Sequence, residues 1–410
     1  MKKLLLSPTI RSAAVYGAAG AGFALANVIL ARVLPPAEYA LVTLVIALVN
    51  VGYALAPAGI DGMVNRQSLE AGPRLLRQVV WATTTTALVF GLIGRLAYGT
   101  TAALTAMIFV STAAGGILMV AAAKFQSEQR FGISLALFQS PNIVLLLAAL
   151  VTVATGVRQA WPALLVMTLG WFPGAIVGWA ILFRERHTKP QRTADFSWHE
   201  ALSLAGMQAT GLLLIQLERL VLPHVLPLRD LATYGVLAAI AGSLFRVLQM
   251  GVGYTMFPRL RAATDVRHRR RLVAKEARLV GVVVLLGSAA IWIVTPLIER
   301  WFLAGKYHLA GSLVFATLVS GVAKVANAFA RSAASAVASP RELAIVNLAG
   351  WVSVAIALVA AVVGARWGLA GVIYGVALGW IVRSAAAAWV AARHLRLPAT
   401  EQAAEAATAR

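Results

Sequence analysis

Residues 30–66 read LARVLPPAEYALVTLVIALVNVGYALAPAGIDGMVNR. One apolar run ends here in VLP, a short turn with an acidic residue follows, and Tyr39 opens a second, longer apolar run. That second run is long enough to cross the roughly 30 Å hydrocarbon core of a bilayer as a helix. The stretch therefore predicts two consecutive membrane-spanning helices joined by a tight connection.

The same order of features returns in the second half of the chain. Residues 222–259 read LPHVLPLRDLATYGVLAAIAGSLFRVLQMGVGYTMFPR, again with VLP, an acidic turn, a Tyr and a long apolar run. The longest polar stretch before the tail, residues 184–200, lies between the two copies. We therefore predict an N-terminal six-helix bundle (1–183), a cytoplasmic linker (184–200), a C-terminal six-helix bundle (201–397) and a cytoplasmic tail (398–410). Two related bundles that face each other across a cleft are typical of transporters.

Composition extends this interpretation to the whole chain of 410 residues. Hydrophobic residues make up 60%, charged residues only 12%, and the mean hydropathy is +0.80. A soluble domain carries about 25% charged residues because its surface faces water. We expect an all-α integral membrane protein of about twelve transmembrane helices in two six-helix bundles around a central cleft. The predicted spans are 11–33, 39–64, 78–97, 101–123, 131–155, 160–183, 201–226, 231–256, 279–298, 309–335, 342–363 and 368–392.

The placement of the cations predicts the orientation of these spans. If the N-terminus is cytoplasmic, 24 of the 36 Lys and Arg residues fall in or beside cytoplasmic segments and 7 on the other side. Cytoplasmic loops carry an excess of Lys and Arg, so both termini are expected inside. A net charge of +21 distributed in this way indicates orientation and contact with membrane lipids, and it does not indicate nucleic-acid binding.

The sequence offers no constellation for catalysis. The chain has no Cys, and its six His residues lack the spacing of a metal site. The glycine-rich stretch between Gly17 and Gly22 has no preceding strand and lies in an apolar run, so it is interpreted as a helix-packing surface. We expect a protein that is not an enzyme and that needs no metal or cofactor.

Polar side chains inside the spans are the candidate functional residues, because they are costly in hydrocarbon and usually face a cavity or a partner. In residues 309–335, Lys324, Asn327 and Arg331 share one helix face. The expected cationic substrate-binding cleft comprises Arg246, Lys324, Arg331, Gln249, Asn327, Arg32 and Asn50. Arginine binds phosphate through its planar fork and lysine binds it as a point charge.

Other interpretations of these charges remain open. Arg331 and Arg383 lie near helix ends, where long cationic side chains often reach lipid phosphates instead of a cavity. Asp61 and Glu218 are candidate coupling acids. At a helix end Asp61 is more often paired, here to Arg66, than a coupling acid, and Glu218 could pair with Arg219 or Arg229.

These features carry a family resemblance. Residues 17–60 and 218–260, and more weakly WGLAGVIYGVALGWIVRS at 367–384, resemble the Wzx-type polysaccharide-biosynthesis flippases of the multidrug/oligosaccharidyl-lipid/polysaccharide exporter superfamily. The resemblance implies a lipid-linked oligosaccharide as substrate, a place in the bacterial inner membrane, and other polysaccharide-assembly membrane proteins as candidate partners. Glu218 and Arg219 stand where the second segment of the family often begins with Asp.

The resemblance implies that the chain moves undecaprenyl-pyrophosphate-linked sugar repeats, such as those of O-antigen, lipopolysaccharide or exopolysaccharide. The alternative within this superfamily is a cation- or proton-coupled multidrug or small-molecule antiporter, which needs buried carboxylates. A membrane glycosyltransferase or polymerase is a third interpretation. It needs a sizeable loop outside the membrane, whereas the expected periplasmic loops are short.

Overall fold

The computed structural model describes residues 8–67, 69–186, 196–263 and 265–396. The described residues form helices joined by short connections and contain no strand. They divide into two compact units, Met1–Ala239 and Ile240–Arg410. The predicted all-α architecture of two units is therefore confirmed. The predicted tail, 398–410, lies outside the described residues.

The first unit is built around two buried helices, α3 and α6. Its helices are α2 (Pro8–Val33), α3 (Pro36–Leu55), α4 (Ile60–Gln67), α5 (Pro73–Tyr98), α6 (Ala102–Ser127), α7 (Phe131–Thr155), α8 (Ala160–Leu169), α9 (Trp171–Arg186), α10 (Trp198–Val225) and α11 (Leu228–Ile240). Small residues allow the close packing: a Cβ on Gly116 of α6 would lie 2.6 Å from side-chain atoms of both Ala56 and Thr83. Lipid tails are as apolar as leucine, so the hydrophobic effect does not drive helices together in a membrane. Helix association depends instead on close packing, which small residues allow.

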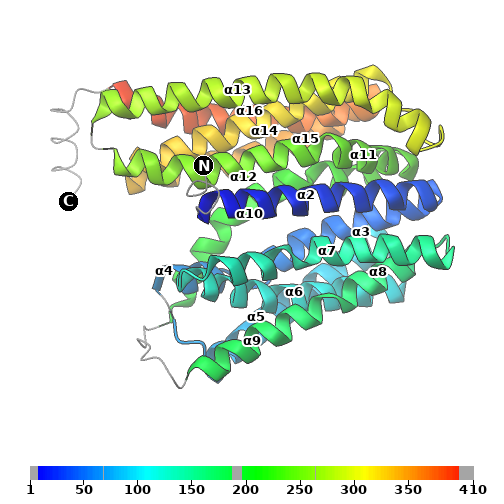
Figure 1. Cartoon of the computed structure of the whole chain (residues 1–410), viewed down its shortest axis with the longest axis horizontal. Helices are drawn as coiled ribbons and strands as arrows, with labels where there is room; N and C mark the ends of the chain where they lie inside the picture. The colour runs from blue at the N-terminus through cyan, green and yellow to red at the C-terminus, as the bar shows by residue number, and fades with distance from the viewer. Residues whose placement is uncertain (1–7, 68, 187–195, 264, 397–410) are drawn as a thin grey trace. The chain divides into compact units, whose positions relative to one another are not determined.

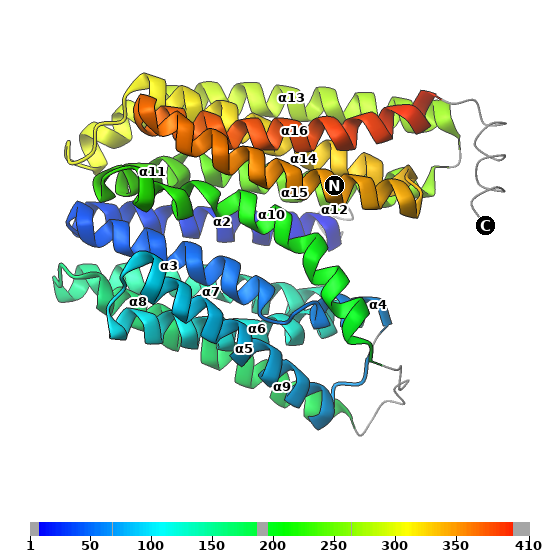
Figure 2. The same ribbon diagram turned by 180° about the vertical axis from the view of Figure 1, so that it is seen from behind.

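The second unit contains α12 (Gly242–Ala262), α13 (Val266–Leu297), the π-helical turn η1 (Ile298–Phe302), α14 (Gly311–Val337), α15 (Pro340–Gly364), the 3₁₀ turn η2 (Ala365–Trp367) and α16 (Gly368–Arg396). Helix α14 packs against both α12 and α16, and α15 and α16 lie side by side as a hairpin (Figures 1 and 2). Helix α15 begins with a capping box in which Ser339 and Glu342 exchange hydrogen bonds, which satisfies amide groups at the start of the helix.

Nine helical stretches in the described residues are long and apolar enough to cross a membrane, or ten if the bent pair α11–α12 is one span. This count takes 341–395 as a single stretch of 55 residues. At about 1.5 Å per residue it is more than twice as long as the bilayer core is thick, so α15 and α16 are two crossings. Counting them separately and adding α2, whose apolar part is the shorter Gly17–Val33, gives the predicted twelve.

The internal repeat predicted from the sequence corresponds to a repeated backbone feature. In each half a helix ends at VLP, at Val33 and at Val225, and the next helix starts within three residues. That next helix is interrupted in both halves. The first break separates α3 from α4 at residues 56–59, and the second bends α11 against α12 by 51° at Ala241. The repeat therefore includes a broken second helix in each half.

The first unit extends past the linker predicted at 184–200, because α10 packs on α3 and α4. Gly59 has a positive φ of 84°, and a Cβ there would lie 1.7 Å from the carbonyl oxygen of Ala201. Arg66 forms an ion pair with Glu200 at 3.2 Å, and the Tyr98 hydroxyl donates to the carbonyl of Leu220 at 2.9 Å. These contacts join α10 to the helices that precede the linker.

The orientation can be checked with single cysteines, since the chain contains none. His268 lies at the start of α13 and His308 just beyond η1, both exposed and at opposite ends of this segment. In intact cells, a cysteine at His308 should react with a membrane-impermeant maleimide, and one at His268 should react only with a permeant one. Labelling of the His268 position by the impermeant reagent would contradict the cytoplasmic assignment of the basic helix ends.

Candidate functional site

The polar stripes of α12 and α14 meet in the second unit. On α14, Lys324, Asn327 and Arg331 recur at steps of three and four and so occupy one face. On α12, Arg246 and Gln249 lie one turn apart. The Gln249 side-chain amide donates a hydrogen bond of 3.0 Å to the backbone carbonyl of Lys324. Five of the residues predicted for the cationic cleft therefore lie on two helices that pack against each other.

Burial within this site is graded. Asn327 is 5% exposed, whereas Arg246, Gln249 and Lys324 are half-buried and Arg331 is exposed. The side-chain amide nitrogen of Asn327 has no hydrogen-bond partner among the described residues. A buried donor without a partner is costly, so it favours a site where water or a ligand supplies the acceptor.

Helix α16 adds a cation that the predicted cleft did not include. Arg383 is only 5% exposed, so it does not extend to lipid phosphates. Its guanidinium carbon lies 5.9 Å from the centre of the Trp380 ring, and its charge interacts with that of Arg331. Two like charges in one partly buried region repel each other, and an anion beside them relieves the repulsion. Arg383 was interpreted from the sequence as a helix-end cation that reaches lipid, whereas it lies in the middle of α16 (Gly368–Arg396).

The charge in these three helices has one sign. Arg246, Lys324, Arg331 and Arg383 lie within α12, α14 and α16, and none of these helices contains Asp or Glu. The region is suited to an anionic group such as a phosphate.

The first unit contains a separate buried polar group around α10. Glu218 is 0% exposed and Arg219 5%. Arg219 donates to the side-chain oxygen of Gln216 at 2.8 Å, and its charge interacts with the Tyr39 phenol of α3. The Tyr39 hydroxyl donates to Asn27 of α2 at 3.4 Å. Glu218 was predicted as a candidate coupling acid, and its neighbours here form a network that the helix spacing of α10 alone does not reveal.

Asp61 lies on α4, which is outside the candidate spans, and is 7% exposed. Burial raises the pKa of its carboxyl above the ordinary value, and hydrogen bonds from the backbone of Gly62 and the side chain of Gln208 oppose this increase. Arg66 pairs with Glu200, so the pairing with Asp61 that the sequence left open is not the one observed. Asp61 is therefore a buried acid held by hydrogen bonds from polar groups.

The remaining predicted residues also lie in the first unit. Arg32 is exposed in the last turn of α2, and Asn50 is half-buried on α3. The predicted set is thus divided: Arg32, Asn50, Asp61 and Glu218 belong to the first unit, and the others to the second.

No family model and no curated protein sequence matches this chain. Several solved structures do match. An inward-facing multidrug resistance MATE family transporter of the MOP superfamily aligns with a TM-score of 0.65 and 13% identity, over 92% of this chain and 94% of that one. The lipid II flippase MurJ in an inward closed conformation aligns with a TM-score of 0.61 and 10% identity, over 93% and 87%. A mutant of the Vibrio cholerae MATE transporter VcmN aligns with a TM-score of 0.55 and 15% identity, over 95% of both chains. At these identities the matches establish a shared fold.

Proposed function

We propose that this protein is a flippase that moves undecaprenyl-pyrophosphate-linked oligosaccharide repeat units across the bacterial inner membrane by alternating access. Its termini would face the cytoplasm. The observation that carries the proposal is the charge of the second unit: α12, α14 and α16 contain eight Lys and Arg residues, Arg246, Lys324, Arg331 and Arg383 among them, and no acidic residue. Membrane helices carry such charges at a cost in free energy, and those that persist usually mark a substrate path.

In this proposal the pyrophosphate of the substrate binds to the cations of α12 and α14. Arg246 offers a planar fork to the phosphate, and Lys324 offers a point charge. Gln249 links α12 to α14 through its hydrogen bond to the backbone carbonyl of Lys324. Asn327 supplies a buried donor whose nitrogen has no partner among the described residues. The substrate can shift the protein between its inward-open and outward-open states only if its anionic head group has a different affinity for each state.

The fold itself is compatible with more than one cargo. One of its structural neighbours is named a lipid II flippase and others are named multidrug transporters. For an anionic, lipid-linked substrate the excess of cations is favourable, whereas a cationic drug would be repelled by it. The charge of the second unit therefore favours the flippase.

A proton-coupled antiporter is the second candidate, and one observation favours it. Asp61 is buried, and this burial raises the pKa of its carboxyl above the ordinary value. A raised pKa is typical of acids with a functional role.

A membrane glycosyltransferase or polymerase has less support. At the end opposite the basic residues, the longest connection between described helices is the eight residues 303–310. This is short for a catalytic loop outside the membrane.

The two transport functions can be separated in proteoliposomes. We expect the purified protein to expose a fluorescent undecaprenyl-pyrophosphate oligosaccharide of the inner leaflet to an impermeant quencher, and Asp61→Asn to reduce this only modestly. Protein-free vesicles and vesicles containing an unrelated membrane protein serve as controls. Proton-dependent uptake of a cationic dye that is lost in Asp61→Asn, without movement of the lipid, would replace the flippase with the antiporter.

A further inference from the structure

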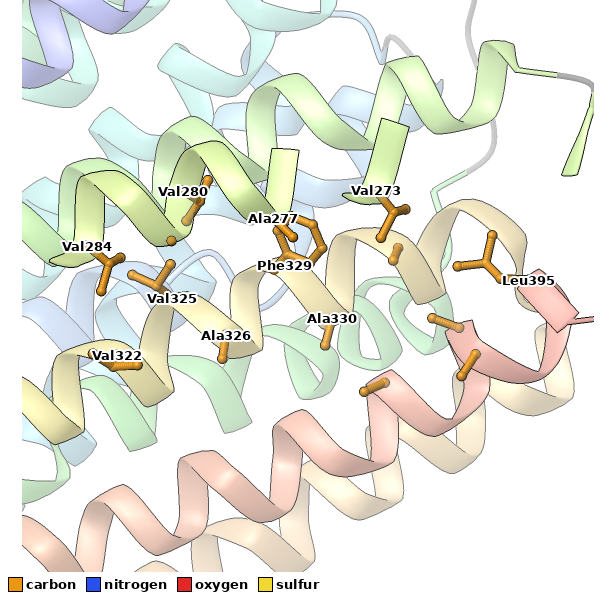
Figure 3. A pocket seen from close by; sticks show the side chains of 15 residues that line it. Val273, Ala277, Val280, Val284, Val322, Val325, Ala326, Phe329, Ala330 and Leu395 are labelled. Carbon is orange, nitrogen blue, oxygen red and sulfur yellow. The ribbon is translucent and has the colours of Figure 1, made fainter. Parts of the chain in front are cut away.

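A groove runs between α13 and the pair α14–α16 in the second unit (Figure 3). It has a volume of about 480 Å³, which lies in the range of roughly 300–1,000 Å³ typical of sites for small ligands. All fifteen residues that line it are Val, Ala, Gly, Phe or Leu. Val273, Ala277, Val280 and Val284 point into it from α13, across from Val325 and Phe329 of α14. The groove therefore suits a hydrocarbon chain.

Most residues of helix α13 are not buried against its unit. Of its residues, only Ile291 and Thr295, near its end at Leu297, are buried. Toward its start, the groove lies between α13 and the pair α14–α16, and Leu272, Val273 and Val280 of α13 are only partly buried against the apolar core of these helices. Interiors of proteins are close-packed, and an unfilled apolar space forfeits the contacts of the atoms that line it. In a bilayer, the acyl chain of a neighbouring lipid can fill this space.

The charges at the basic end of the groove indicate which head group is attached to such a hydrocarbon chain. Arg269 and Arg270 precede the groove-lining stripe of α13 by about one turn and fall on the same helix face. Arg270 donates a hydrogen bond to the backbone carbonyl of Leu395, a residue of the groove wall, and Arg269 donates to the carbonyl of Ala263 at 2.7 Å. Each bond uses one of the five N–H donors of a guanidinium. Clusters of Arg and Lys at such positions attract anionic lipid head groups.

The transported lipid is not the expected occupant, because of the geometry of α14. The groove-lining residues Val322, Val325, Ala326 and Phe329 occupy one face of this helix. The polar stripe with Lys324 and Asn327 occupies the opposite face. A lipid whose head group bound the polar stripe would have to pass its tail around the helix to enter the groove.

We propose that the groove is a binding site for an anionic phospholipid of the bilayer. One acyl chain fills the space between α13, α14 and α16, and the head-group phosphate binds Arg269 and Arg270. The bound lipid holds α13 against its unit from behind the polar face. This site is independent of the substrate proposed above.

Native mass spectrometry of the full chain, released from vesicles of equal parts phosphatidylglycerol and phosphatidylethanolamine, tests the proposal. The wild type should retain phosphatidylglycerol in preference to phosphatidylethanolamine. Ala277→Phe combined with Ala326→Phe fills the groove and should abolish retention. Arg269→Gln combined with Arg270→Gln should reduce the preference for the anionic lipid about tenfold, as expected from the loss of charged hydrogen bonds.

Matched controls separate these effects from general damage. Ala289→Phe makes one Ala-to-Phe substitution at an exposed position of α13 outside the groove, and Arg271→Gln with Arg278→Gln removes two charges from the other face of the same helix. Both controls should retain the lipid as the wild type does. Three results would overturn the proposal: unchanged retention in the groove-filled variant, a retained polyprenyl lipid instead of a phospholipid, or a dimer that the groove-filling substitutions dissociate.

Discussion

Replacing Arg246 with Gln should reduce transport about ten- to hundred-fold, since a charged hydrogen bond to phosphate contributes about 1.5–3 kcal/mol. The same reduction is expected for Lys324→Gln. Glutamine keeps a long polar side chain, and removing a charge from a span lowers the cost of insertion, so both variants should reach the membrane at normal levels. Flipping of the fluorescent lipid, normalised to the amount of protein in the vesicles, measures the effect.

Two further variants refine this prediction. Arg246→Lys should keep part of the activity if charge alone binds the substrate, and little if the planar fork is needed. Arg366→Gln removes an exposed cation from η2, which is outside the polar stripes of α12 and α14, and should leave transport unchanged. Near-normal transport by both Arg246→Gln and Lys324→Gln would place the anion site elsewhere, with Arg331 and Arg32 as the next residues to replace.

Replacing Gly375 with Ala should lower the free energy of unfolding of the second unit by about 1–3 kcal/mol, the usual range for overpacking. A Cβ at this position of α16 would lie 2.4 Å from backbone atoms of Ala360 and Ala361 on α15. Backbone atoms cannot rotate away as a flexible side chain can, so the two helices would have to separate. Gly375→Val should be more severe and prevent the folded protein from accumulating.

The thermal stability of the purified protein in detergent, followed by size-exclusion chromatography, measures this effect. Gly206→Ala is the matched control, because no atom lies within 4 Å of a Cβ at that position of α10. It should match the wild type or slightly exceed it, since Ala is favoured over Gly inside a helix. Equal stability of Gly375→Ala and Gly206→Ala would show that the α15–α16 contact tolerates separation.

Much of the fold follows from local features of the sequence. The length of an apolar run and the cations at its ends depend on residues that are neighbours in the chain, and they predicted the spans and the all-helical class. The VLP connections of the repeat were likewise visible, because a motif at the end of a helix is also local. Within the site, the stripe with Lys324 and Asn327 was predictable from helical period alone.

The partners of each helix were decided only by the tertiary structure. The polar stretch at 184–200 indicated a boundary between halves, yet α10 packs with the first unit through the pair Arg66–Glu200 and the close approach at Gly59. Arg383 was interpreted from the sequence as a cation that reaches lipid near a helix end, and it is instead buried in the middle of α16 beside Trp380. The groove behind α14 has no signature in the sequence, since its Ala and Val residues resemble those of any span. The physical reason is common to all three. In lipid, the apolar faces of a helix are equally compatible with a neighbouring helix and with acyl chains, so hydropathy determines that a helix lies in the membrane but not what it lies against.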